Sequence, residues 1–150
     1  MVAGPAIPHA LPAPLDEKSY FRGRLAVIRE VERGAGWQND PDWSPKDKAA
    51  TRKGFVRVPM LVSEEPGAVA RFAFEGTAVG IFVAAGPDAG TLEFSIDDGP
   101  FRSQSLSTNW SATLPIPWAY VLDADLPPGK HILAMRAAKG AIRIAYMLVN

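Results

Sequence analysis

The sequence has no cysteine, only two histidines and no excess of charge of either sign. Without cysteine, disulfide bonds and thiolate metal sites are excluded. Sixteen Lys and Arg residues balance sixteen Asp and Glu residues, so nothing in the charge suggests nucleic acid or an anionic membrane as a partner. No apolar run is long enough to cross a bilayer, so we expect no membrane insertion.

The first fifteen residues also lack the basic and apolar segments of a signal peptide. They contain instead Pro5, Pro8, Pro12 and Pro14, a density typical of an extended linker or surface strap. If the protein is exported, its signal is therefore expected to lie outside this sequence. We expect residues 1–15 to form this linker, and residues 16–150 to form one domain with a core of its own.

The clearest periodicity in the chain lies between Ala68 and Asp97. Apolar and polar residues alternate from Ala70 to Glu75, which is typical of a half-buried antiparallel strand. Residues 77–83 are apolar on both faces, which favours an inner strand. The turn Gly86–Gly90 then leads into a third alternating segment, residues 92–96. This stretch predicts three strands separated by two turns.

The rest of the chain shows short strands at regular spacing with turn residues between them. We expect strands at 24–31 (where a helix also fits), 55–61 (with Pro59 marking an edge or a bulge), 101–107, 118–123, 131–137 and 141–149. Asp98-Gly99 favours a hairpin turn, and Lys139-Gly140 is expected to close a hairpin of the last two strands. Eight or nine such strands predict an all-β, antiparallel β-sandwich of jelly-roll type.

Strand alternation also predicts the core. Its expected members are Phe72, Phe74, Ile81, Phe94, Ile96, Leu133, Ile144 and Tyr146. Trp118 is expected to join them, because Tyr120 and Leu122 continue its face of the strand.

Two long segments, Glu32–Gly54 and Thr108–Pro117, are predicted to be loops at one end or along one face. Long loops in small domains often carry function. Aromatic rings can stack on sugar rings and amide or carboxylate groups can bond their hydroxyls, so the candidate ligand-binding residues are Trp37, Trp43, Trp110, Asn39, Asp40 and Asn109. The alternative is that these tryptophans plug the end of the sandwich or pack against another domain.

Catalytic and metal-binding patterns are missing from the sequence. His9 lies in the proline-rich segment, and His131 is expected to be a partly buried residue at a strand end, bonded to a turn carbonyl. No nucleophile–base–acid set can be assembled, so we assign no catalytic residue, no metal ligand and no cofactor. The pairs Asp97–Asp98 and Asp123–Asp125 fit turn chemistry better than a calcium site.

The segments GFVRVPMLVSEEPGA, FEGTAVGIFVAAGPDAG, SIDDGPF, LPPGKHILAMR and RIAYMLVN carry a family resemblance. They resemble the jelly-roll, carbohydrate-binding-like accessory domain of bacterial SGNH/GDSL-type hydrolases, which is related to the jelly-roll domain of carbohydrate esterase family two. The resemblance runs from about Leu15 to Asn150. The catalytic Gly-Asp-Ser and Asp-x-x-His motifs of that family do not occur here.

The resemblance implies a non-catalytic accessory domain or subunit of an SGNH-type esterase, with a carbohydrate deacetylase as the parent. Its expected partner is a carbohydrate or the SGNH catalytic domain. The alternative is a structural module that docks a catalytic domain without binding sugar. Exposed aromatic rings on one face would favour the first function, and buried rings would favour the second.

Overall fold

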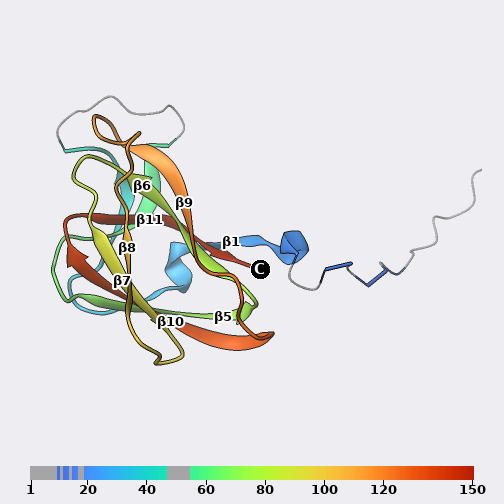
Figure 1. Ribbon diagram of the computed structural model, residues 1–150. Coiled ribbons are helices and arrows are strands. Elements are labelled where there is room, and N and C mark those ends of the chain that lie inside the picture. Colours follow the sequence, from blue (N-terminus) through green and yellow to red (C-terminus); the bar gives the residue numbers. More distant parts are fainter. Residues whose placement is uncertain (1–9, 11, 14, 17–18, 47–54) are drawn as a thin grey trace, which may run out of the picture.

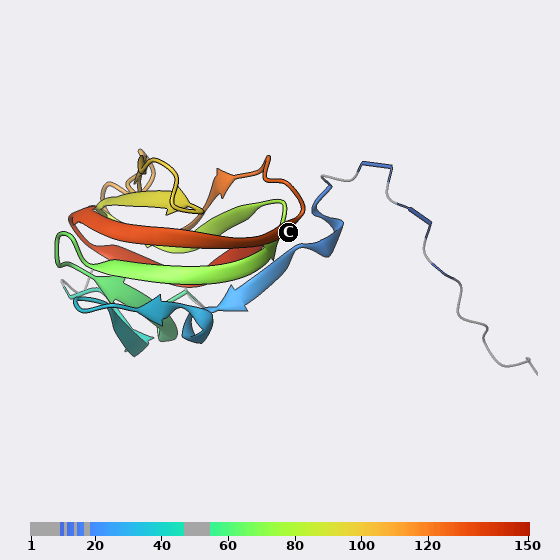
Figure 2. The ribbon, with the colours of Figure 1, turned by 90° about the horizontal axis from the view of Figure 1, so that it is seen from below.

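A computed structural model describes residues 10, 12–13, 15–16, 19–46 and 55–150 of the chain. Two antiparallel sheets pack face to face as a β-sandwich (Figures 1 and 2). In the first sheet, sheet A, the order is β3 (Gln38–Trp43), β4 (Val58–Ser63), β11 (Ile142–Val149), β6 (Val79–Ala85) and β9 (Ile116–Asp123), with β1 (Arg24–Val27) also pairing with β11. In sheet B the order is β2 (Glu32–Arg33), β5 (Val69–Gly76), β10 (Gly129–Lys139), β7 (Thr91–Ile96) and β8 (Arg102–Ser105).

The all-β sandwich and the three strands of the central stretch are confirmed. In β5, Phe72 and Phe74 are buried while Arg71 and Glu75 are exposed, as the alternation predicts. β6 lies between β11 and β9, which is the inner position that an apolar strand favours. The hairpin between β7 and β8 forms as well, with positive φ angles at Asp97 and Asp98.

The predicted hairpin of the last two strands is wrong. β10 pairs with β5 and β7 in sheet B, whereas β11 pairs with β1, β4 and β6 in sheet A. Gly140, with φ of +65°, carries the chain from one sheet to the other. Turn residues such as Lys139-Gly140 determine a change of direction, and the pairing of the strands beyond them is decided by the packing of both sheets.

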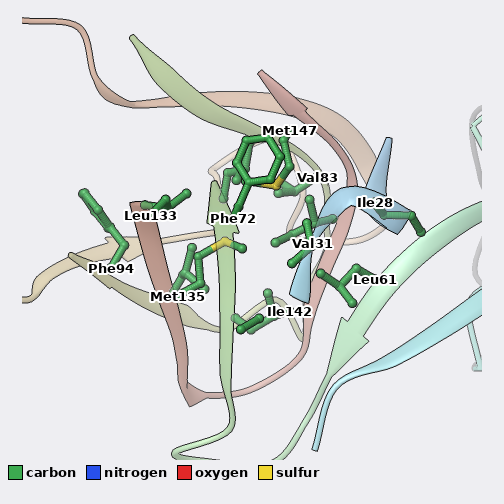
Figure 3. Packing of buried hydrophobic residues seen from close by; sticks show 14 of the residues in the cluster. Ile28, Val31, Leu61, Phe72, Val83, Phe94, Leu133, Met135, Ile142 and Met147 are labelled. Atoms are coloured by element: carbon green, nitrogen blue, oxygen red, sulfur yellow. The ribbon is translucent and has the colours of Figure 1, made fainter. Parts of the chain in front are cut away.

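The main core fills the space between the sheets. Figure 3 shows Phe72 of β5 beside Met147 of β11, with Val83 and Leu133 nearby. All the predicted core residues except Ile96 and Tyr146 are buried, and Ile96 packs partly buried against the same cluster. Tyr146 is the exception, because β11 has a bulge between Ile144 and Tyr146 that turns Tyr146 to the outer face.

The segment Glu32–Gly54 is not one long loop. It contains β2 and β3, and residues 47–54 lie outside the described residues. The predicted strand at 24–31 is β1 followed by a single 3-10 turn, Ile28–Glu30, while another 3-10 turn, Tyr20–Arg22, precedes it. Pro59 lies in β4 opposite an irregularity of β3 between Asp40 and Trp43, so its bulge interpretation is confirmed.

Trp118 was expected to belong to the core, but it does not. Its side of β9 faces inward with Tyr120 and Leu122, but β9 is the edge strand of sheet A and Trp118 stays 37% exposed.

Within the described part of the chain, no helix is long and apolar enough to cross a membrane.

Candidate functional site

A hollow of about 750 Å³ lies at the end of sheet A where β11 begins. Its lining comes from four places in the sequence: β3 and the residues after it, the end of β4, the turn after β6, and the start of β11. Pro115 adds the end of the long segment between β8 and β9. The sandwich thus brings distant segments together around one concave surface.

Strand register places the floor of this hollow on the outer face of sheet A. Gln38 of β3 lies opposite Val62 of β4, and Val62 lies opposite Arg143 of β11. Directly opposed residues in antiparallel strands share a face. The three side chains therefore form one row across the sheet, and Pro45, Pro87 and Pro115 surround it with apolar, rigid surface.

The centre of this floor is an arginine that is almost fully buried. Arg143 is 7% exposed, and its two terminal nitrogens, Nη1 and Nη2, donate to the two carboxylate oxygens of Asp88. The Nη1–Oδ1 distance is 2.9 Å. The guanidinium also lies 5.3 Å from the centre of the Trp43 ring, within cation–π range. Asp88 from one turn and Trp43 from β3 thus fix the position of Arg143.

Hydrogen bonding favours the ionised form of Asp88. The hydrogen bonds from Arg143 are the main reason that the pKa of Asp88 is lowered below its usual value, although partial burial opposes the shift. A second ion pair, Lys46 Nζ to Glu64 Oε1 at 2.7 Å, lies on the rim and is exposed to water. Both pairs offer polar groups to whatever occupies the hollow.

The structure divides the predicted site residues into three groups. Asn39, Asp40 and Trp43 line the hollow. Trp37, in contrast, is a buried member of the main core at 5% exposure, and its indole nitrogen has no hydrogen-bond partner in the described part of the chain. Trp43 is equally buried at 6%, so neither ring presents a free face for stacking.

Asn109 and Trp110 form the third group. Trp110 is 75% exposed, and its backbone N–H donates to Thr108 Oγ1. The segment that carries it ends next to Pro115, which lines the hollow together with β3 and Ser44, Pro45 and Lys46. The described part of the first segment and the end of the second thus meet at the hollow, although neither Asn109 nor Trp110 lines it.

Sequence reasoning missed Arg143 and Asp88. Arg143 stands between Ile142 and Ile144 in an apolar strand, and a charge in such a run is a signal for a buried ion pair. Asp88 was assigned only to the turn Gly86–Gly90. The pairing itself has no local signal, because the two residues are 55 positions apart.

His131 occupies the environment that was predicted for it. Its Nε2 bonds the carbonyl of Pro127 at 2.8 Å, and its Nδ1 bonds Asp97 Oδ2 at 2.6 Å. These contacts, led by the one with Asp97, raise the pKa of His131, and the hydrogen bond with His131 is the main reason that the pKa of Asp97 is lowered. With both ring nitrogens engaged, the histidine holds two turns against β10.

The two acidic turns also make local contacts. Asp97 accepts the backbone N–H of Ile132, and Asp123 accepts that of Asp125 and pairs with Arg102. Among the described residues, no group of three or more His, Cys, Asp or Glu is arranged to hold a metal ion. Turn chemistry accounts for these carboxylates.

A second concave surface, an apolar groove of about 310 Å³, lies at the other end of β11 on the same outer face. Leu25, Leu148, Gly80 and Val121 follow one another across β1, β11, β6 and β9 in a single cross-strand row. At Gly80 a Cβ atom would lie 2.4 Å from the carbonyl oxygen of Tyr120, so the close approach of β9 requires glycine. Leu25 and Val121 are more than half exposed.

No protein-family model matches the sequence, and no curated protein matches it either. Solved structures do match the fold. A two-domain esterase active on acetylated mannans, co-crystallised with mannopentaose, has a TM-score of 0.67 at 12% identity over 94% of this chain. The chain spans only 39% of that esterase.

Two further structures extend the comparison. A family two carbohydrate esterase from Cellvibrio japonicus has a TM-score of 0.52 at 11% identity, and the match covers 85% of this chain and 32% of the esterase. A family 35 carbohydrate binding module from Clostridium thermocellum has a TM-score of 0.54 at 12% identity, and here the match covers 84% of this chain and 95% of the module. The chain therefore shares the fold of these structures, a jelly-roll β-sandwich.

Proposed function

We propose that this chain is a non-catalytic carbohydrate-binding domain and that the hollow at the start of β11 holds its ligand. The observation that carries the proposal is the buried Arg143, paired with the more exposed Asp88, in the floor of a hollow of about 750 Å³. This volume lies in the range of small-molecule sites, and a few fixed polar groups among apolar walls are typical of them. Asn39 and Asp40 add amide and carboxylate groups at the edge.

The structural neighbours support a sugar as the ligand. One is a carbohydrate binding module, which this chain matches over 95% of that module's length, and another is an esterase active on acetylated mannans. We further propose that the parent protein is an SGNH-type esterase that removes acetyl groups from carbohydrate. This proposal depends on the likeness of part of the esterases to this chain and on the sequence resemblance.

Titration of the ¹⁵N-labelled protein with mannopentaose and β-1,3-galactotriose tests the ligand site. We expect amide shifts to be concentrated at Gln38, Asn39, Lys46 and Glu64, which surround the hollow. Lys130 and Ile132, on the outer face of sheet B, serve as internal controls that should not move. A protein that binds neither sugar, or shifts that cluster on sheet B, would contradict the proposal.

The apolar groove supports a second function, docking to a catalytic domain. A cross-strand row of exposed leucine and valine is costly to leave in water, and such patches mark interaction surfaces. Leu25→Asp should then weaken association with an SGNH-type catalytic domain encoded in the same genome, measured by pull-down. Ile132→Asp, at a comparably exposed position on sheet B, is the matched control. Equal capture of both variants would argue against docking through this groove.

A further inference from the structure

Arg143 has hydrogen-bonding capacity that the protein does not use. A guanidinium carries five N–H donors, and the two bonds to Asp88 use one on each terminal nitrogen. The Nε–H and the outer N–H of each terminal nitrogen make no hydrogen bond to the described residues. These donors belong to a side chain that is 93% buried and that lines the hollow. These spare donors can bond a ligand oxygen in place of water, so a ligand with acceptors at this position would be favoured.

Asp88 offers the complementary group beside those donors. Its side chain is 60% exposed, and each carboxylate oxygen can accept more than the one bond that Arg143 donates. A bidentate pair therefore presents an N–H donor and a carboxylate acceptor next to each other along its edge. A sugar hydroxyl both accepts and donates, so two neighbouring hydroxyls can satisfy the donor and the acceptor together.

We propose that the Arg143–Asp88 pair is the specificity determinant of the hollow, and that it binds two adjacent hydroxyls of a neutral sugar ring. This inference rests on the proposed carbohydrate function. Trp43 has a positioning role, because its ring lies against the guanidinium and is too buried to contact a sugar itself. Recognition in this site would thus depend on hydrogen bonding rather than on aromatic stacking.

The charge of the hollow favours a neutral ligand. Of the residues that the structure describes, two cationic side chains, Arg143 and Lys46, and three anionic ones, Asp40, Glu64 and Asp88, line it. Both cations are already paired with carboxylates of the same surface. Among the described lining residues, an anionic group would therefore meet no unpaired positive charge, and the carboxylates would repel it.

The alternative is that Arg143 and Asp88 only clamp the turn after β6 onto β11. The chain provides a matched pair for comparison on the outer face of sheet B. There Arg136 Nε donates to Glu93 Oε2 at 2.8 Å, and its guanidinium lies 4.4 Å from the centre of the Phe101 ring. This arginine–carboxylate–aromatic group has the same chemistry but does not line the hollow.

The test measures sugar affinity and folding in the same variants. Asp88→Asn and Arg143→Met remove the acceptor and the donors, while Glu93→Gln and Arg136→Met make the same changes in the control pair. Affinity is measured by calorimetry with mannopentaose and β-1,3-galactotriose, with trigalacturonate as an anionic probe. Circular dichroism melting reports the fold, and Asp88→Asn keeps the test valid if Arg143→Met does not fold, because Asp88 is largely exposed.

We expect Asp88→Asn and Arg143→Met to weaken binding of the neutral sugar by tenfold or more, and the control variants to bind within twofold of the wild type. Trigalacturonate should bind more weakly than the neutral sugars. Folded variants of the hollow that bind like the wild type would overturn this inference and leave the proposed function standing, as would tighter binding of trigalacturonate than of either neutral sugar. A wild-type protein that binds none of the probes would overturn both.

Discussion

The outer faces of the two sheets differ sharply in chemistry. On sheet A, Met60, Ala84 and Ala145 are buried, and Phe55 packs edge-on against Phe82 at 5.6 Å between ring centres. On sheet B, the corresponding face carries charged side chains such as Arg71, Glu75 and Lys130, all exposed. One sheet faces water, whereas the other supports a second, smaller core, against which Phe55 and Val56 also pack.

This difference shows where the molecule can make contacts. A charged, solvated face is costly to cover, because each of its groups would lose water. The outer face of sheet A already combines covered apolar surface, a hollow with a buried arginine and an apolar groove. Both proposed functions therefore use this face.

The largest expected change in unfolding free energy tests whether the buried residues on the outer face of sheet A form a true core. Met60 is 0% exposed, so Met60→Ala should lower the unfolding free energy by about 2–5 kcal/mol through lost burial and a cavity. Ile132→Ala, half exposed on sheet B, should change it by less than about 1 kcal/mol. Urea denaturation measures both, and equal midpoints for the two variants would show that the faces do not differ.

The next prediction compares how much the Arg143–Asp88 and Arg136–Glu93 pairs contribute to the unfolding free energy. Asp88→Asn leaves a buried guanidinium without its charged partner, and should cost about 1–3 kcal/mol. Glu93→Gln leaves Arg136 partly in water and should cost at most about 1 kcal/mol. Thermal unfolding ranks the two variants, and the reverse order would refute the role assigned to burial.

A third prediction concerns the pH dependence of sheet B. The pKa of His131 is raised above its unfolded value of about 6.5, so its contribution to stability is complete below that pH and disappears as pH rises through the folded pKa. The pKa of Asp97 is lowered, so its contribution is present above about 3.8 and is lost as pH falls through the folded pKa.

Comparison with His131→Gln separates this contribution from the rest. The unfolding free energy of the wild type should exceed that of the variant most clearly between about pH 4 and 6.5, and the difference should shrink at higher pH. Urea denaturation across that range measures it. A constant difference from pH 5 to pH 9 would mean that the His131–Asp97 contact makes no pH-dependent contribution.

The smallest effect on stability is expected at Trp110. Because this side chain is 75% exposed, Trp110→Ala should change the unfolding free energy by less than about 0.5 kcal/mol. If the ring extends the sugar surface at this end of the sandwich, the variant should bind mannopentaose about tenfold more weakly, a loss of about 1.4 kcal/mol. Unchanged affinity would remove Trp110 from the ligand site.

Local patterns in the sequence were sufficient to predict much of the fold. Alternation in β5 and β7 and the apolar run of β6 predicted both strands and core, because side chains on a strand face opposite sides. β3 escaped prediction since Gln38–Trp43 is polar and contains a proline, and its pairing with β4 holds it in the sheet. Propensity alone gives no sign of such a strand.

The candidate site was less predictable than the fold. Asn39 and Asp40 were found from residue type and from their place in a long irregular segment. The burial of Trp37 and Trp43 depends on what packs over each ring, and the Arg143–Asp88 pair depends on one turn and one strand meeting in space. These are properties of the assembled sandwich, and no window of neighbouring residues contains them.

The crossing of the chain between β10 and β11 has a consequence for biosynthesis. Residues 129–149 supply the central strand of sheet B and, in sheet A, the strand between β4 and β6. Until the ribosome has released them, β4, β5, β6 and β7 each lack a partner and expose strand edges that can join other chains. The nascent protein therefore cannot complete either sheet early, and its need for chaperones should be greatest just before these residues emerge.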